Sequence, residues 1–364
     1  MSSFFLSISP LVLALFHVVV QVCSQSCQVA ISELQSERKV IILNSDKRSL
    51  KQPSNGKYSW KSGESIYFIC GKDLKTLTCS PSSINAKRFD CVKPPDVTER
   101  DINRECNGKS SKTFQMGFRA SGGLFVPYYE LCYLMDTCSV SHVKHRLLGA
   151  SFGGVSGTRE KSFQSFVCPG LRYNTHYTQA SQKQPDPRFY FQRGHLFPDR
   201  DAPVFAWKLA TYSYGNCVPQ WNTINSEGGN WWTLEYLVFK YAQQTPNTEY
   251  TIYDGVLYDP RNKQYLAKQE KKIEIPVWFW KVVTNQTHVL KVFFVSHNLK
   301  GTKQTFCNTN RCVNDRAKGT KTVETWDFYN EASRGITHCC YWKDLARKNP
   351  LPIEVQREIN NKKN

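Results

Sequence analysis

The stretch FYFQRGHLFPDRD, residues 189–201, carries the side chains with the clearest chemical potential in the chain. Hydrolysis of a phosphodiester needs a base that activates water and positive charge beside the phosphate. His195 titrates closest to neutral pH, so it is the candidate general base, and Gly194 would let the backbone pass close to a substrate. The Arg193 guanidinium matches phosphate oxygens. By type and spacing alone, such a pair is more often structural than catalytic.

A second stretch, NCVPQWNTINSEGGNWWTLE at residues 216–235, supplies oxygen ligands. Asn225 and Glu235 carry the amide and carboxylate oxygens that Mg²⁺ prefers, and Mg²⁺ keeps several waters and needs few protein ligands. One of these waters would protonate the leaving oxygen. Together the two stretches predict metal-assisted phosphodiester hydrolysis.

The order of these motifs resembles a known family. QRGHLFPDRD, ATYSYGNCVPQWNTIN and NWWTLE are similar to the pattern DRGH, N-x-x-P-Q, Asn and W-x-x-L-E of the DNA/RNA non-specific endonucleases, the ββα-metal nucleases. DGVLYD, IPVWFWKVV and THCCYW resemble its secreted arthropod branch, which includes insect gut and salivary nucleases. The resemblance covers residues 115–350 and implies an α+β, ββα-metal nuclease fold with a central antiparallel sheet.

The resemblance also implies roles for individual residues. His195 matches the family's general base, and Arg193 matches the arginine of the same motif. Asn225 matches the asparagine that holds Mg²⁺, with Mn²⁺ as the alternative ion. Glu235 matches the glutamate that positions metal-bound water, and Asn216 matches a motif asparagine that we expect to support the site.

The chain departs from the family pattern at three places. One is DRDAP, residues 199–203, which replaces the usual Ala-Asp-Phe run after the histidine and whose proline could shift the start of the next helix. Gln192 stands where many members have aspartate. Asn225 and Glu235 are ten residues apart, whereas the family spacing is eight. On a continuous helix, two extra residues rotate the glutamate by about 200° away from the asparagine. A bulge at Gly228–Gly229 would preserve the geometry, and a different register would give Glu227 the place of the asparagine.

The rest of the sequence predicts the elements that must position these residues. Apolar periodicity predicts strands, strand pairs and helices around a sheet. Residues 142–145 place two histidines at helical spacing, for which a solvated basic face is favoured over a metal site. The predicted strands are 123–135 and 188–192, the predicted strand pairs are 250–259 and 277–298, and the predicted helices are 205–214 and 230–244.

Three segments are expected along the chain. Residues 1–24 carry no charged side chain, and the apolar run Leu11–Val22 is too short to span a bilayer. We therefore expect a signal peptide, with a buried N-terminal helix as the alternative. Residues 25–105 are expected to form a small β-rich, cysteine-containing region, and residues 106–355 the endonuclease domain. VKPPDVTERD, residues 92–101, is predicted as the linker because prolines resist helix.

Cysteines indicate an oxidising compartment. Of 14 cysteines, Cys23 falls in the predicted signal peptide and 13 remain. Such density in a secreted chain predicts disulfides, and the odd number predicts one free or intermolecular thiol. Zinc is the competing interpretation, but the sequence has no CxxC pair. Asn285 opens the sequon N-Q-T at a predicted turn and is a candidate glycosylation site.

Charge indicates the partner. The chain carries a formal net charge of +18, spread over several clusters. Nucleic acid is the first expected partner, ahead of heparin-like glycans and anionic membranes, and solubility alone is the alternative explanation of the charge. No later segment is long and apolar enough for a membrane anchor.

These observations predict a secreted, Mg²⁺-dependent endonuclease that acts with low sequence specificity on DNA and RNA, especially on duplexes. The alternative is a nuclease-fold salivary protein with weak or lost catalysis that binds nucleic acid tightly. The positive charge favours both, and the two extra residues before Glu235 favour the second. A glycan-binding protein would leave the motifs unexplained.

Overall fold

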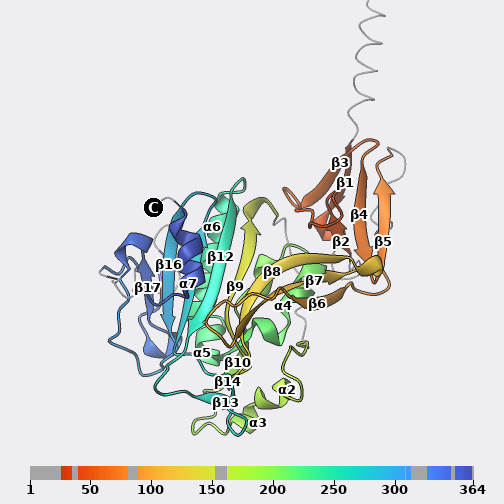
Figure 1. Ribbon diagram of the computed structural model, residues 1–364. Helices are drawn as coiled ribbons and strands as arrows, with labels where there is room; N and C mark the ends of the chain where they lie inside the picture. Colours follow the sequence, from red (N-terminus) through yellow and green to blue (C-terminus); the bar gives the residue numbers. More distant parts are fainter. Residues whose placement is uncertain are drawn as a thin grey trace, which may run out of the picture.

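The computed structural model describes residues 26–34, 40–80, 89, 91–151, 162–307, 309–312, 326–345 and 349–362. Its main element is an antiparallel sheet with the strand order β17-β16-β15-β12-β9-β8-β7-β6 (Figure 1). The predicted α+β fold with a central antiparallel sheet is thereby confirmed. The strands are β6 (Asp96–Asp101), β7 (Ser111–Arg119), β8 (Phe125–Leu134), β9 (Ser139–Leu148), β12 (Glu249–Leu257), β15 (Trp278–Thr284), β16 (Val289–Ser296) and β17 (Thr337–Cys340).

One face of the sheet packs against helix α6 (Asn230–Gln244). Leu234 and Val238 are four residues apart, so they project from the same side of the helix. They belong to one buried apolar cluster with Val143 of β9 and Ile252 of β12. The helix has the bounds predicted from its apolar spacing, and it brings Glu235 to this face of the sheet.

The opposite face packs against helix α7 (Ile353–Asn360). Val355 and Ile359 form a separate apolar cluster with Trp280 and Val282 of β15. Figure 1 shows α7 crossing the sheet over β12 and β16. The two faces of the sheet are therefore buried under different elements.

A hairpin of β10 (Phe191–His195) and β11 (Cys217–Trp221) carries the first predicted motif. The chain between its strands contains α4 (Phe205–Thr211), which begins at the predicted residue and ends three residues before the predicted end at residue 214. The short helix α5 (Asn222–Asn225) follows β11 directly and precedes α6. This order, two antiparallel strands and then helix, is the local arrangement that the family resemblance implies.

The N-terminal region forms two small sheets that lie beyond the β6–β8 end of the large sheet (Figure 1). Disulfides Cys27–Cys79 and Cys70–Cys91 join its strands, so its β-rich, disulfide-bonded character is as predicted. The strands are β1 (Ser26–Ala30), β2 (Ile41–Leu43), β3 (Lys57–Lys61), β4 (Ser65–Cys70) and β5 (Asp73–Thr78).

Three predictions of secondary structure were wrong. The linker predicted at residues 92–101 contains β6, whose backbone pairs with β7 as the edge of the large sheet. Residues 250–259 do not form a strand pair, because β12 runs straight through the Asp254-Gly255 turn signal. His142 and His145 lie on the strand β9, where alternation sends them to opposite faces and buries both.

Six disulfides join twelve cysteines of the described chain, and Cys217 is a buried free thiol. Both the predicted disulfides and the single unpaired cysteine are therefore present. The predicted signal peptide lies outside the described residues. Besides the two N-terminal bridges, the disulfides are Cys106–Cys132, Cys138–Cys168, Cys307–Cys340 and Cys312–Cys339.

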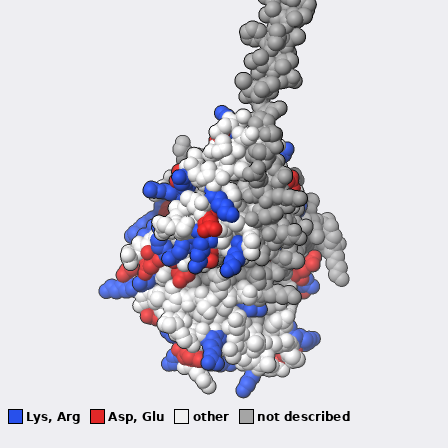
Figure 2. Space-filling view, turned by 90° about the vertical axis from the view of Figure 1, so that its right-hand side faces the viewer, with Lys and Arg blue, Asp and Glu red and all other residues white. Residues whose placement is uncertain are grey.

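The positive charge is distributed. On the face drawn in Figure 2, lysine and arginine side chains lie in several patches with acidic side chains between them. Within the part of the chain that the structure describes, no helix has the length and apolarity needed to cross a membrane.

Candidate active site

His195 and Arg193 lie on the same face of β10 and share an aromatic neighbour. Phe163 lies 5.1 Å from the His195 ring and 5.2 Å from the Arg193 guanidinium carbon. The ring of Tyr212 meets His195 edge-on at 4.7 Å. Both His195 and Arg193 keep partial exposure, so the structure brings a candidate base and a fixed positive charge together at the surface.

Hydrogen bonds fix the Arg193 side chain. Its Nη1 donates to Asn174 Oδ1 at 3.2 Å, and the Tyr214 hydroxyl donates to the same oxygen at 2.5 Å. Burial raises the pKa of Tyr214 to about 12, so its hydroxyl stays protonated at neutral pH and keeps donating. Asn174 and Phe163 therefore hold the guanidinium in one orientation.

Gly194, the residue before His195, leaves space for a side chain of the paired strand. A Cβ atom at Gly194 would lie 2.1 Å from Cδ of Gln220 on the paired strand. The sequence suggested that this glycine lets the backbone approach a substrate, but here it gives room to the neighbouring strand.

Gln192 and Asn225 contact each other on the other side of β10. Asn225 Nδ2 donates to Gln192 Oε1 at 2.8 Å, and the Ser226 hydroxyl donates to the same oxygen at 3.2 Å. Because the amide nitrogen of Asn225 faces Gln192, its Oδ1 points away from Gln192. The residue that departs from the family motif thus orients the predicted metal ligand.

The two extra residues lie between helices. α5 ends at Asn225 and α6 begins at Asn230, so the case of one continuous helix is wrong. Gly228 has a φ of 90°, and a Cβ atom at Gly229 would lie 2.2 Å from the carbonyl oxygen of Ile224. Glycines therefore permit the break that the sequence left as one alternative. Glu227 is exposed in this connection.

Glu235 is buried behind the hairpin. It follows Trp231 by one helical turn, and Trp231 Nε1 donates to the His195 carbonyl at 3.4 Å. Burial raises the pKa of Glu235 to about 8, against the lowering influence of Arg200 and Lys281. Burial therefore favours the protonated form of this carboxyl over the carboxylate.

Glu235 interacts with a set of buried ionisable residues that we call the buried charge cluster: His145, Asp201, Asp254 and Lys281. His145 Nε2 lies 3.1 Å from Asp201 Oδ2, and its Nδ1 lies 3.4 Å from Asp254 Oδ2. Lys281 forms an ion pair with Asp254. Every side chain of the cluster is at most 3% exposed. Three strands and the turn after His195 meet here.

The cluster supports the chain after His195. The Phe197 ring stacks on His145 at 3.9 Å with 9° between the planes. Asn216 is fully buried, accepts a hydrogen bond from the Phe197 amide at 2.8 Å and donates to the Phe197 carbonyl at 2.9 Å. These contacts agree with a supporting place for Asn216.

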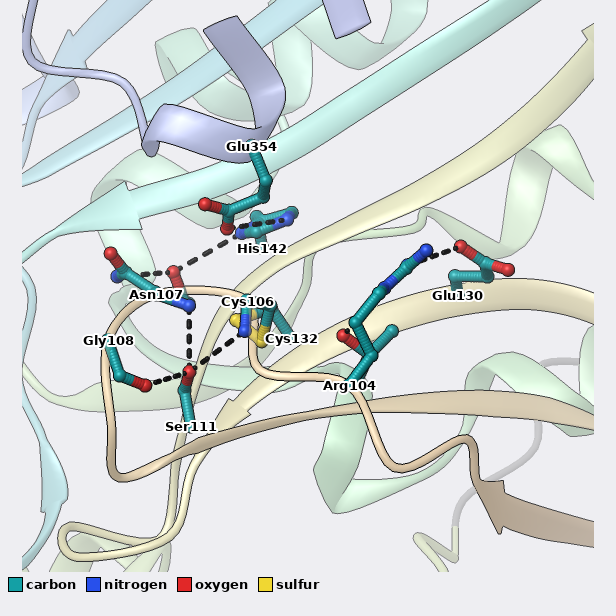
Figure 3. Close-up of a disulfide and its surroundings, with 11 residues drawn as sticks. Arg104, Cys106, Asn107, Gly108, Ser111, Glu130, Cys132, His142 and Glu354 are labelled. Atoms are coloured by element: carbon teal, nitrogen blue, oxygen red, sulfur yellow. Dashed lines mark hydrogen bonds and ion pairs between the residues drawn. A yellow bond between two sulfur atoms is a disulfide. The ribbon is translucent and has the colours of Figure 1, made fainter. Parts of the chain in front are cut away.

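A group elsewhere has metal-binding residue types. Among the described residues, Cys132, His142 and Glu354 bring their ligand atoms within 4.8 Å of one another. Figure 3 shows that Cys132 is bonded to Cys106, so its sulfur is no thiolate ligand. Burial also lowers the pKa of His142 to about 3. The disulfide removes the zinc interpretation at this group.

Sequence reasoning missed several of these residues. Asn174 and Phe163 carry no local signal, because only the fold brings them to Arg193. Asp254 and Lys281 did carry one: each is a charged residue inside an otherwise apolar strand, and buried charges are rare unless they are paired.

The candidate glycosylation site lies where the sequence places it. Asn285 follows β15, and its Oδ1 accepts hydrogen bonds from the backbone amides of Thr287 at 3.0 Å and His288 at 2.7 Å. The sequon therefore forms the turn before β16, and the modification itself stays a prediction.

Comparison with known proteins adds to this geometry. Residues 109–345 match the family model described as DNA/RNA non-specific endonuclease. The chain is 27% identical to a salivary endonuclease of Lutzomyia longipalpis, over 93% of this chain and 87% of the relative. It is 24% identical to salivary protein Tsal1 of Glossina morsitans morsitans, over 80% of each chain. It is 20% identical to Tsal2A of the same fly, over 90% of this chain and 92% of the relative.

Proposed function

The chain belongs to the DNA/RNA non-specific endonuclease family, and we propose that it is a secreted, metal-dependent endonuclease that hydrolyses phosphodiester bonds in DNA and RNA, duplexes above all. One observation carries the proposal: His195 and Arg193 share a face of β10, both against Phe163 and both partly exposed. A base and a fixed cation side by side are what attack on a phosphate requires.

Different residues of the chain have different roles in the proposed reaction. His195 takes the proton of the attacking water, because an imidazole nitrogen is the most common general base among side chains. Arg193, held by Asn174, compensates the negative charge that grows on the phosphate oxygens. Tyr212 and Phe163 pack against the imidazole and restrict its motion. The base and the cation are thus oriented before substrate arrives.

Asn225 offers one oxygen of the kind that a hard divalent cation binds. Asn225 turns its amide oxygen away from Gln192, and Mg²⁺ accepts one or two protein oxygens while it keeps several waters. We propose that Asn225 holds Mg²⁺, or Mn²⁺ in its place. The bound ion would supply positive charge beside the phosphate and acidic water for the leaving oxygen.

Glu235 supports a second candidate function. Its carboxyl is buried beside the buried charge cluster, and its pKa is raised to about 8. The burial of this carboxyl, which is 8% exposed, favours a nuclease of reduced rate, or a protein with lost catalysis that binds nucleic acid tightly.

The substrate and the site of action follow from charge and cysteines. A net charge of +18 favours phosphate contacts that do not read bases. Six disulfides are typical of an extracellular protein. The names of the relatives suggest saliva as the fluid in which this chain acts.

The test compares two histidine variants of the purified full chain on plasmid DNA and on duplex RNA, with Mg²⁺ and with a chelator. His195→Ala removes the proposed base, and His288→Ala removes an exposed histidine of the β15–β16 turn. We expect His195→Ala to lose about 10²-fold or more of the activity, and His288→Ala to retain it. Cleavage that persists in chelator and in His195→Ala would exclude this mechanism.

A further inference from the structure

Two adjoining hollows open beside the far end of the β10–β11 hairpin. They have volumes of about 680 and 730 Å³, and both are lined by Phe191, Trp221, Gln264 and Ile275. The two hollows share these walls, and together we call them the basic groove. Each half has the volume of a pocket that takes a small organic ligand, so each half has room for a nucleotide.

The shared wall is aromatic. The rings of Phe191 and Trp221 stack with centroids 3.8 Å apart, and Trp221 keeps partial exposure. His297 fixes this pair from behind: its Nε2 accepts a hydrogen bond from the Trp221 amide at 2.9 Å, and its Nδ1 donates to the Pro276 carbonyl at 2.7 Å. A held, half-exposed aromatic ring is a surface on which a base can stack.

The rim is positive. Five lysines and arginines line the two hollows, against two carboxylates, Asp259 and Glu270. All five basic side chains are exposed. They come from the end of α3 (Gln179–Gln182), from the β13–β14 hairpin (Tyr265–Ala267 and Lys272–Glu274), and from loops beside the large sheet. The five are Lys183, Arg261, Lys263, Lys268 and Lys300.

The basic groove lies next to the candidate active site. Phe191 is four residues before His195 on β10 and shares its face with Arg193 and His195, because side chains alternate along a strand. At about 3.3 Å per residue, the groove begins about 13 Å from the base. Figure 1 shows β10 beside the β13–β14 hairpin and α2–α3 at one end of the molecule.

We infer that the basic groove binds a single, unpaired strand of nucleic acid that continues from the phosphate being cleaved. A positive groove that follows the backbone, with an aromatic ring for stacking, is the chemistry by which proteins hold single strands without reading their sequence. The inference rests on the proposed function, since it concerns the unpaired part of a nucleic-acid substrate beyond the bond that the proposed nuclease cleaves.

The test measures binding without cleavage, in chelator, of a fluorescent oligothymidylate of twelve nucleotides and of a blunt duplex of the same length. Lys263→Glu with Lys268→Glu reverses two exposed charges of the groove. Lys61→Glu with Lys75→Glu reverses two exposed charges on the N-terminal sheets and is the matched control. Wild-type plasmid cleavage with Mg²⁺ is measured beside them.

We expect the groove variant to bind the oligothymidylate at least tenfold more weakly, and the control less than threefold more weakly. The slope of log affinity against log salt should fall by about 1.4, which is two lost phosphate contacts on a single strand. Unchanged binding by the groove variant, or an equal loss in the control, would overturn the inference. An equal loss for the duplex would also overturn it, because the groove would then be a duplex surface. Groove-dependent binding without plasmid cleavage would support the groove and contradict the nuclease.

Discussion

On the two faces of the central sheet, histidine side chains lie in different environments. His145 and His142 are three residues apart on β9, yet His145 lies between the carboxylates of Asp201 and Asp254, whereas His142 lies 3.6 Å from one oxygen of Glu354. The first histidine faces the hairpin that carries His195, and the second faces α7. Charge is thus concentrated beneath the candidate site, while α7 packs on a mainly apolar surface.

This difference affects the stability of the folded chain. Buried ions cost several kcal/mol to desolvate, and only close partners offset this cost. Apolar residues in place of Asp254 and Lys281 would avoid this desolvation cost. We infer that the buried charge cluster is kept because it holds the turn after His195.

The largest expected effect separates the two faces by stability. Lys281→Met leaves Asp254 buried without its cation, which should lower the free energy of unfolding by about 3–5 kcal/mol. Lys144→Met on the other face breaks an ion pair with the partly exposed Glu358, worth about 1 kcal/mol or less. Denaturant titration of both variants measures the contrast, and equal losses would show that the faces do not differ.

Activity gives the next contrast. Glu235→Gln should reduce plasmid cleavage by about 10²-fold if the carboxylate form works in catalysis. Glu354→Gln on the α7 face should leave cleavage unchanged, because this carboxyl lies behind the sheet. If both variants cleave plasmid at the wild-type rate, Glu235 has no catalytic role.

The pH dependence of stability tests the burial of Glu235. Its pKa is raised from 4.5 to about 8, first of all by desolvation, so between these values the folded state holds a proton that the unfolded state releases. This contribution is present below pH 4.5 and is lost as the pH rises toward 8. The stability of wild type relative to Glu235→Gln should therefore fall across this window. A constant difference would contradict a buried, protonated Glu235.

The smallest effect concerns the metal. Gln192→Asp restores the common family residue beside Asn225 and adds a negative charge near the proposed ion. We expect the Mg²⁺ concentration for half-maximal cleavage to fall a few-fold, and Asn225→Ala to raise it. If neither substitution changes the Mg²⁺ concentration for half-maximal cleavage, the ion binds elsewhere.

Local signals predicted the elements around the site well, and long-range contacts could not be predicted. The 3–4 spacing from Trp231 to Val238 gave α6 its correct bounds, and the sequon at Asn285 marked a real turn. The strand pair predicted over residues 250–259 is a single strand, and the reason for Gly255 within it is distant in the sequence: a Cβ atom there would lie 2.2 Å from the Trp280 ring.

The buried charge cluster shows the same limit at the site. His145 and Asp254 come together only through the pairing of β9 with β12, which no local pattern specifies. The roles implied for His195 and Arg193 needed only their motif, and the structure gives the two residues one shared environment. The break between Asn225 and Glu235 was one of three open alternatives, and only the folded chain shows α5 and α6 as separate helices.

The most direct test of the central claim is the single-turnover rate on duplex DNA that is already bound. Protein in excess over a labelled duplex is mixed with Mg²⁺, for wild type and for His195→Ala at equal occupancy. The account predicts that wild type cleaves the bound duplex and that His195→Ala binds it equally well but cleaves about 10²-fold or more slowly. Wild-type protein that binds the duplex and leaves it intact would contradict the account and establish the binding function instead.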